Sequence, residues 1–485
     1  MNKIFRYTLA AMAMTVCSNT LAQNLSGAYF MDGYAFGHQL NPAKEYDRKG
    51  YVAFPLVPLG NMNVALRGNL NLKDVLYPNP NGSGLVTYLH PSLSPEQALS
   101  GFSEKNKLMT DLRMDLISFG FHSKHAYQTF TLGLRTRLGV NVPYSLFDLT
   151  KNLKNQDYDI SKFGMEAMAW VEAGWGYSRD VTDYLRVGGK LKLLFGAGYA
   201  KARMESLKLN LAGEDQWTAT AQANVEVGVK GFTWGEPEIK EYSDAYKQNH
   251  PGATTYEAVD FDNIDVESPG LGGMGMGIDL GAELDLDKLC GVSGLKVSAS
   301  VLDLGFIKWK NVAVAQNKGD EFKFDGFQNI KVDDGPGTDF DDQTDDLSDR
   351  LSDLYAIQAG ETKSKVTGMG ATMNIGVEYT LPMYKKVNFG LLSTTRFQGD
   401  YTWNEERLAV NYHPCKWFEF GVNGAVGTLG ASFGWIVNIH PSGFNLFLGG
   451  DHLLGKLSKQ GIPLKSNADI ALGINFPLGK SRIKR

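Results

Sequence analysis

The chain has 485 residues, a formal net charge of −5, 55 glycines and many aromatic side chains. The negative charge and the lack of a basic patch with interleaved aromatic residues argue against nucleic-acid binding. After the first 22 residues no run of about 18 apolar residues follows, which excludes a transmembrane helix but not membrane strands, because these are apolar on one face alone.

Residues 1–22 have the pattern of an export signal. Lys3 and Arg6 precede the apolar run TLAAMAMTVCS, which is too short to span a bilayer, and Ala22 places a small residue at the expected cleavage point. We therefore expect the mature chain to begin at Gln23.

Long segments of strict alternation predict strands. In 217–230, WTATAQANVEVGVK, every odd position is apolar and every even position is polar or glycine, and the segments 274–286 and 369–381 alternate in the same way. Such strands exceed the five or six residues of an ordinary strand and the roughly 9 to 11 that cross a bilayer when tilted. The apolar face is predicted to touch lipid, and the sheet must then close, because hydrocarbon cannot hydrogen-bond an open edge.

The sequence therefore predicts an all-β fold, a transmembrane antiparallel β-barrel of the outer membrane. In chain order we place strands at 60–70, 109–121, 126–140, 165–177, 184–199, 202–212, 216–230, 273–286, 294–309, 366–381, 386–398, 400–413, 416–427, 430–440, 443–453 and 467–478. These are 16 strands. The segments 60–70 and 202–212 are the weakest, so a 14-strand barrel is the alternative, and a soluble β-sandwich is disfavoured by strand length.

The links between strands alternate in length. Short turns such as HSKH and HPSG interleave with the long loops 71–108, 141–164, 231–272 and 310–365. Long outer loops and short periplasmic turns are typical of outer-membrane barrels. Aromatic residues near segment ends are interpreted as interface girdles: Trp175, Tyr177, Tyr199, Trp217, Trp309 and Tyr379.

The polar face of these strands carries both signs of charge, which predicts a hydrated, salt-bridged lumen. The candidates to face the lumen are Arg135, Arg137, Glu166, Glu172, Arg186, Lys190, Lys192, Glu226, Asp279, Glu283, Asp303 and Glu378. In 295–306 the apolar residues change from odd to even positions, which indicates one β-bulge, with Asp303 at the change of phase.

The long loops contain three short amphipathic segments. Ser94 is a predicted N-cap for a helix that begins at Pro95, and helical stripes occur in 145–153 and 345–355. Such helices either cover the barrel mouth or gather an apolar ligand.

Other motifs have simpler explanations. The acidic run 333–349 lacks the glycine and final glutamate of a calcium-binding EF-hand loop, so we interpret it as a solvated loop, with calcium binding left open. Cys290 and Cys415 are expected to be free thiols, although the sequence does not exclude a disulfide. No nucleophile motif such as G-x-S-x-G is present, so we expect no enzyme activity, no cofactor and no metal.

Three segments resemble an uncharacterised family of outer-membrane barrels, related to the long-chain fatty-acid transporter group and to barrels associated with type IX secretion. They are SGAYFMDGYAFGHQLNPA (26–43), TDYLRVGGKLKLLFG (182–196) and SVLDLGFIKWK (300–310). The resemblance implies an N-terminal plug, with the motif Leu40, Asn41, Pro42 and Ala43, and passive uptake of hydrophobic small molecules that leave sideways through a kink in the wall.

On this reading residues 1–22 are the signal peptide, 23–48 the plug or lead-in segment, 49–479 the multi-pass outer-membrane barrel and 480–485 a basic periplasmic tail. The expected partners are the lipid bilayer of the outer membrane, hydrophobic small molecules, and secretion or surface proteins. A transporter of hydrophobic small molecules is the first hypothesis. The alternatives are a secretion- or assembly-associated scaffold with a plugged lumen and a general diffusion porin.

Overall fold

The computed structural model describes residues 25–54, 61–80, 82, 84–211, 216–261, 263–267, 270–319, 321–327, 339–452 and 467–481. The expected signal at 1–22, most of the tail expected at 480–485 and the first part of the acidic run 333–349 lie outside these residues.

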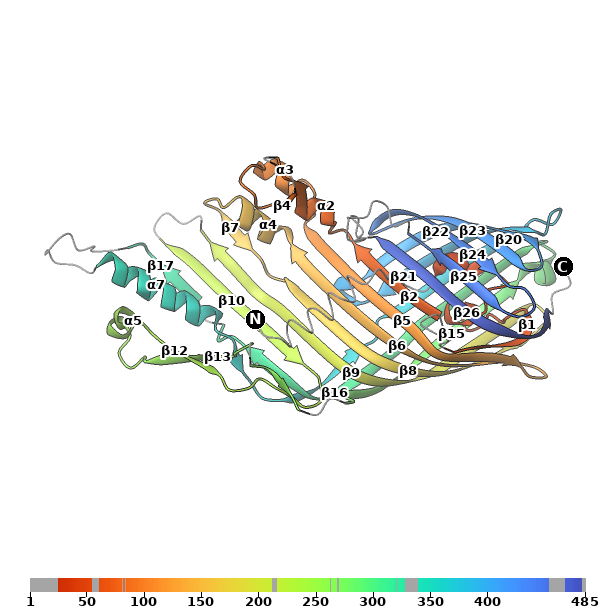
Figure 1. The fold of residues 1–485 in the computed structure, drawn as a ribbon, viewed down its shortest axis with the longest axis horizontal. Coiled ribbons are helices and arrows are strands. Elements are labelled where there is room, and N and C mark those ends of the chain that lie inside the picture. Colours follow the sequence, from red (N-terminus) through yellow and green to blue (C-terminus); the bar gives the residue numbers. More distant parts are fainter. Residues whose placement is uncertain are drawn as a thin grey trace.

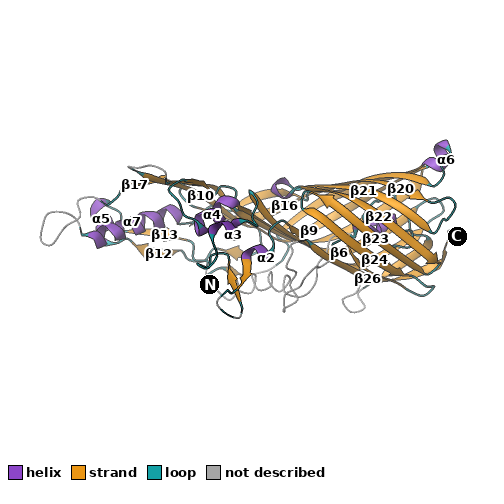
Figure 2. Cartoon of the chain, turned by 90° about the horizontal axis from the view of Figure 1, so that it is seen from above, coloured by secondary structure: helices purple, strands orange, loops and turns teal. Residues whose placement is uncertain are grey.

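The fold is a closed antiparallel β-barrel with 14 strand positions in its wall (Figures 1 and 2). The wall is formed, in order, by β1 (Arg48–Ala53) with β2 (Asn61–Gly68), β5 (Lys105–His122), β6 (Tyr127–Pro143), β8 (Gly164–Asp180), β9 (Leu185–Asn210), β15 (Gly273–Asp285), β16 (Leu295–Gln316), β19 (Lys363–Gly368) with β20 (Ala371–Thr380), β21 (Val387–Phe397), β22 (Trp403–Cys415), β23 (Phe418–Gly427), β24 (Gly430–Ile439), β25 (Asn445–Gly450) and β26 (Ala468–Ser481). β1 pairs with both β5 and β26, so the first and last strands meet and close the sheet.

The wall has the 14 strand positions of the alternative prediction and not 16, for two reasons. The segments 184–199 and 202–212 are one continuous strand, β9, because the chain passes a register shift opposite Ala169 and Trp170 without turning. The segments 216–230 and 273–286 share one position in the wall. β10 (Trp217–Val227) pairs with the second half of β9, and β15 pairs with the first half.

The two ends of the barrel differ. Short turns join the strands at one end, at the right in Figure 1, which we call the turn end. This end carries α6 (Leu286–Cys290), which is labelled in Figure 2. The long insertions extend from the other end, the loop end. They contain α2 (Leu72–Val75), β3 (Leu76–Pro78), β4 (Leu85–Thr87), α3 (Pro95–Leu99), α4 (Tyr144–Lys151), β7 (Asp157–Asp159), β17 (Glu321–Phe324), α7 (Phe340–Tyr355), β18 (Gln358–Ala359) and η3 (Gly399–Tyr401).

The insertion between β10 and β15 forms a separate arm. The arm consists of β11 (Phe232–Thr233), β12 (Glu238–Glu241), α5 (Asp244–Asn249), β13 (Thr255–Ala258) and β14 (Asp265–Val266), and α5 packs against α7. The predicted helix at Pro95 is confirmed: the Ser94 side chain accepts a hydrogen bond of 3.2 Å from the backbone N–H of Gln97.

The outward face of most wall strands is apolar, as alternation predicts. Leu191, Met274 and Ile375 are exposed on three different strands. The apolar face of β10 is an exception, because Ala219 and Ala221 are buried against Leu354 of α7. The prediction that this face touches lipid is therefore wrong, and a helix from a distant loop covers it instead.

Among the described residues no helix is both long enough and apolar enough to cross a bilayer. Cys290 and Cys415 are free thiols.

Candidate functional site

Residues 25–47, which we call the N-terminal segment, are enclosed by the barrel. The segment contains η1 (Ser26–Phe30) and η2 (Gly37–Gln39), and its apolar residues Tyr29, Phe30, Phe36 and Leu40 are buried in one cluster with residues of the wall. Tyr51, Leu392 and Phe447 of the wall belong to the same cluster, so the segment packs against several strands.

Hydrogen bonds connect the segment to the wall on opposite sides of the lumen. The backbone N–H groups of Ser26 and Gly27 donate to the Asp451 carboxylate at 2.6 and 2.7 Å. The Leu40 carbonyl accepts from Ser300 Oγ at 2.8 Å and from Asn374 Nδ2 at 3.2 Å. These bonds connect the segment to strands that are far apart in the sequence, so it is an integral part of the barrel interior.

The motif Leu40, Asn41, Pro42 and Ala43 lies directly against the wall. Asn41 Nδ2 donates to the Ala282 carbonyl at 3.2 Å and to the Tyr29 hydroxyl at 3.1 Å. A Cβ atom at Gly281 would lie 2.0 Å from Asn41 Oδ1, so only glycine permits this approach.

His38 of the same segment is buried. Its burial, together with the nearby Lys190 and Arg113, holds its pKa well below 6.5, so the ring is neutral and shares a hydrogen bond of 2.7 Å with the Tyr51 hydroxyl.

A layer of charged side chains lies next to the N-terminal segment, on the side of the loop end. This charged belt consists of Arg113, Asp115, Arg135, Glu172, Lys190, Lys192, Asp279 and Asp303. Lys192 Nζ lies 2.6 Å from Asp303 Oδ1 and 2.7 Å from Asp279 Oδ1, and Arg135 lies 3.1 Å from Glu172. The belt holds four basic and four acidic groups, so its charges balance within it.

The bulge predicted at Asp303 is present. The register of β15 and β16 shifts between Ile278 and Leu280, and Asp303 has a φ of 59°. The bulge aims the Asp303 N–H at Asp279 Oδ1, 2.7 Å away, and its carboxylate at Lys192 and Arg135.

Three other lumen candidates lie at the turn end. Arg186 pairs with Glu45 at 3.0 Å and donates to the Ala43 carbonyl, Glu283 lies 3.8 Å from Lys44, and Glu378 accepts from Asn388. All three line a cavity of about 290 Å³ beside the N-terminal segment.

The remaining candidates lie towards the loop end. Arg137 is 3.5 Å from Asp111, and Glu166 is 3.5 Å from Lys201. Glu226 accepts a hydrogen bond from the Tyr199 hydroxyl at 3.0 Å and pairs with Lys365. The twelve candidates therefore form three groups along the barrel axis rather than one site.

An apolar cluster inside the barrel was not predicted. It lies beyond the charged belt towards the loop end and consists of Met168, Trp170, Leu194, Tyr199, Ile307, Trp309, Val312 and Met369. Tyr199 and Trp309 were expected in an interface girdle, and this prediction is wrong. The register shift in β9 and the bulge at Asp303 each reverse the face of the residues that follow, which turns both rings inward.

One sequence signal for this cluster was available. Trp309 lies over Gly196, where a Cβ atom would be 2.5 Å from the indole ring. A glycine on the polar face of a strand thus marked a place where a large side chain from another strand had to fit.

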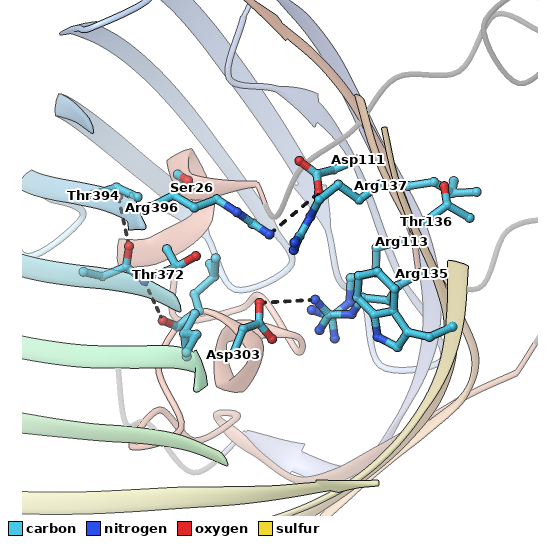
Figure 3. A pocket seen from close by; sticks show the side chains of 15 residues that line it. Ser26, Asp111, Arg113, Arg135, Thr136, Arg137, Asp303, Thr372, Thr394 and Arg396 are labelled. Carbon is cyan, nitrogen blue, oxygen red and sulfur yellow. Dashed lines mark hydrogen bonds and ion pairs between the residues drawn. The ribbon is translucent and has the colours of Figure 1, made fainter. Parts of the chain in front are cut away.

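The charged belt and the N-terminal segment leave little open space between them. The cavity at this level has a volume of about 40 Å³ and is lined in part by Leu40, Trp170, Arg137 and Arg396 (Figure 3). A water molecule occupies about 30 Å³ of liquid, so this space suits a small ion or a water molecule rather than a continuous channel.

The wall beside the apolar cluster departs from a regular ladder on consecutive strands. The chain leaves the wall after Val227 and returns at Gly272, and Gly228 and Tyr199 exchange backbone hydrogen bonds at the junction. Asn311 in β16 has a φ of 54°, and Gly370, between β19 and β20, has a φ of 75°. These irregularities coincide with the level of Trp309 and Met369.

The described residues contain no group of three or more His, Cys, Asp and Glu side chains arranged to hold a metal ion. The described part of the acidic run 333–349 begins at Asp339 and continues into α7.

Comparisons with known proteins identify a family match over most of the chain. Residues 42–451 match the model of DUF5723, described as a family of unknown function. No curated protein matches the chain.

Among solved structures, the chain is 8% identical to the P. putida toluene transporter TodX, with a TM-score of 0.37, covering 91% of this chain and 93% of that chain. It is 8% identical to the translocator domain of the autotransporter NalP from Neisseria meningitidis, with a TM-score of 0.34 and coverage of 95% and 100%. It is also 8% identical to a Pseudomonas aeruginosa FadL homologue, with a TM-score of 0.33 and coverage of 95% and 93%.

Proposed function

The chain belongs to the DUF5723 family, whose function is unknown, and we propose that it is an outer-membrane barrel for the passive transport of hydrophobic small molecules. The observation that carries the proposal is the apolar cluster inside the barrel, around Trp170, Trp309 and Met369. A water-filled pore does not need large apolar side chains in its lumen. An apolar solute, in contrast, is stabilised when it moves from water to contact with such side chains.

The route beyond the cluster is proposed to be sideways. The balanced charges of the belt and the N-terminal segment obstruct the axis, and an apolar solute would have to displace buried ion pairs in order to pass. The wall next to the cluster is irregular at Gly228, Asn311 and Gly370, where fewer regular ladder hydrogen bonds need to break. A transient opening at this level would release the solute into the bilayer.

The N-terminal segment acts as a fixed plug in this proposal. Its amides and carbonyls bond to Asp451, Ser300 and Asn374, on opposite sides of the lumen, so removing it would break several buried hydrogen bonds at once. The segment therefore stays in place while the wall moves.

We expect Met369→Gln to lower the uptake rate of an alkyl aromatic compound about tenfold, because a buried amide without a partner costs about 1–3 kcal/mol and weakens partition into the cluster. Met369 is 2% exposed and Met383, in a turn, is 97% exposed, so Met383→Gln is the matched control. Uptake is measured into proteoliposomes whose outer leaflet is lipopolysaccharide. No uptake by the unaltered protein, or equal uptake by both variants, contradicts the proposal.

A scaffold with a plugged lumen is the second candidate. The observation that favours it is the large structure at the loop end, where α5 of the arm packs against α7 and Ser243 donates to Asp349 at 2.7 Å. Recovery of stoichiometric partner proteins with the intact barrel, and their loss when residues 236–259 of the arm are replaced by a short linker, would favour this function over transport.

A general diffusion porin is not supported by this geometry, since the N-terminal segment and the charged belt occupy the lumen. Small or absent currents in planar bilayers are the expected result.

A further inference from the structure

Two arginines face each other across the cavity of about 40 Å³ (Figure 3). Arg137 comes from β6 and Arg396 from β21, and both are buried. Arg137 Nε lies 3.5 Å and Arg396 Nη2 lies 3.8 Å from the same oxygen, Oδ1 of Asp111. The Asp111 carboxylate is thus shared by two guanidinium groups.

Their other hydrogen bonds add no negative charge. Arg137 Nη2 donates to the Met369 carbonyl at 2.6 Å, and Arg396 Nε donates to Gln398 Oε1 at 3.0 Å. The Asp303 carboxylate of the charged belt also lines the cavity, but it is already paired with Lys192 at 2.6 Å and with Arg135 at 3.5 Å. The group of Arg137, Arg396 and Asp111 therefore keeps one positive charge in a buried place.

Two buried donors that line this cavity are also outside hydrogen-bonding geometry with any acceptor. Within the described residues, the Nε–H of Arg137 and the indole N–H of Trp170 make no hydrogen bond. The Arg137 guanidinium lies 5.6 Å from the centre of the Trp170 ring, so both donors belong to one small space. A buried donor without an acceptor is costly, and a net charge adds to that cost.

We propose that this cavity binds an oxyanion group with a single negative charge, either as a free ion or as the head group of an amphiphile. The anion neutralises the surplus charge of Arg137 and Arg396 and accepts from the two unpaired donors. The chain of an amphiphile would leave the cavity past Trp170, whose side chain lines the cavity and belongs to the apolar cluster. The site holds the anion whether or not the barrel transports anything.

The test uses calorimetric titration of the whole protein in nanodiscs of zwitterionic lipid. The probes are octanesulfonate, methanesulfonate and, as an uncharged chain, octanol. Octanesulfonate is expected to bind with one-to-one stoichiometry. Arg396→Gln should weaken the binding of octanesulfonate about tenfold or more, because it removes a charged donor to the anion. Asp111→Asn should tighten this binding about tenfold, because it removes the carboxylate that competes with the anion for both guanidinium groups.

Arg203→Gln is the matched control. Arg203 also lies inside the barrel wall, but its partner Asp400 is 3.2 Å away and both are more exposed, so this change should leave the affinity unaltered. Heat-modifiable migration on gels verifies the folding of each variant. If Arg396→Gln does not fold, the opposite shift expected for Asp111→Asn still decides.

The two sources of the anion give different results. Equal affinity for methanesulfonate and octanesulfonate identifies a free oxyanion. Tighter binding of octanesulfonate, with the difference lost in Met369→Gln, identifies the head group of an amphiphile. The inference is overturned if neither sulfonate binds, if octanol binds as tightly as octanesulfonate, or if Arg396→Gln and Asp111→Asn leave the affinity unchanged.

Discussion

Arg407→Ala is expected to lower the free energy of unfolding by about 3–5 kcal/mol, the cost of breaking a buried ion pair on one side. Arg407 is 1% exposed, pairs with Glu405, and its Nη1 lies 3.6 Å from Asp451 Oδ1. The same Asp451 carboxylate accepts from the first amides of the N-terminal segment. Loss of the guanidinium leaves the buried Asp451 carboxylate without its arginine partner and loosens the attachment of the segment.

The measurement is urea-induced unfolding in lipid vesicles, followed by tryptophan fluorescence. Arg203→Ala is the control, because Arg203 is partly exposed and its ion pair with Asp400 should contribute no more than about 1 kcal/mol. If both variants lose the same stability, the network around Arg407 is not the anchor inferred from the structure.

Ile375→Arg is expected to cost about 2–4 kcal/mol of folding stability in membranes, the cost of a charge on the lipid face near the bilayer centre. Ile375 lies on β20, is 46% exposed and points out of the wall. Ile239→Arg provides the control: Ile239 lies on β12 of the arm and is 64% exposed, so the same change in water should stay within about 0.5 kcal/mol.

The comparison of the two isoleucine variants locates the bilayer. Both residues have the same side chain and similar exposure, so a difference between them reports the medium outside the protein rather than packing. Equal costs at the two positions would mean that the outward face of β20 does not contact hydrocarbon.

The alternation in 217–230 illustrates how far the sequence alone could lead. It predicted a strand with one apolar face, and β10 is that strand. It also assigned Val225 to lipid, whereas Val225 packs against the cluster that contains Trp234 of the arm. The prediction of an apolar face was correct, but the prediction that this face contacts lipid was wrong. The alternation of a strand shows which face is apolar and does not show whether lipid or protein covers it.

The sequence left the number of strands open between 14 and 16 for a related reason. A bulge and a turn both interrupt the period of two, and β9 continues through its interruption. β10 and β15 are separated by an insertion and look like two strands in the sequence, but together they fill one position in the wall. Only pairing with a neighbour distinguishes these cases.

The sequence by itself determined that the chain is a barrel with an apolar outside and a charged inside, because a period of two assigns each residue to a face. It also located the bulge at Asp303 through the change of phase. The tertiary structure alone decided which side chains meet: Lys192 with Asp303, Trp309 over Gly196, and Arg137 opposite Arg396. Such meetings depend on strand register and on closure across the lumen, and one bulge reverses the face of every residue that follows it.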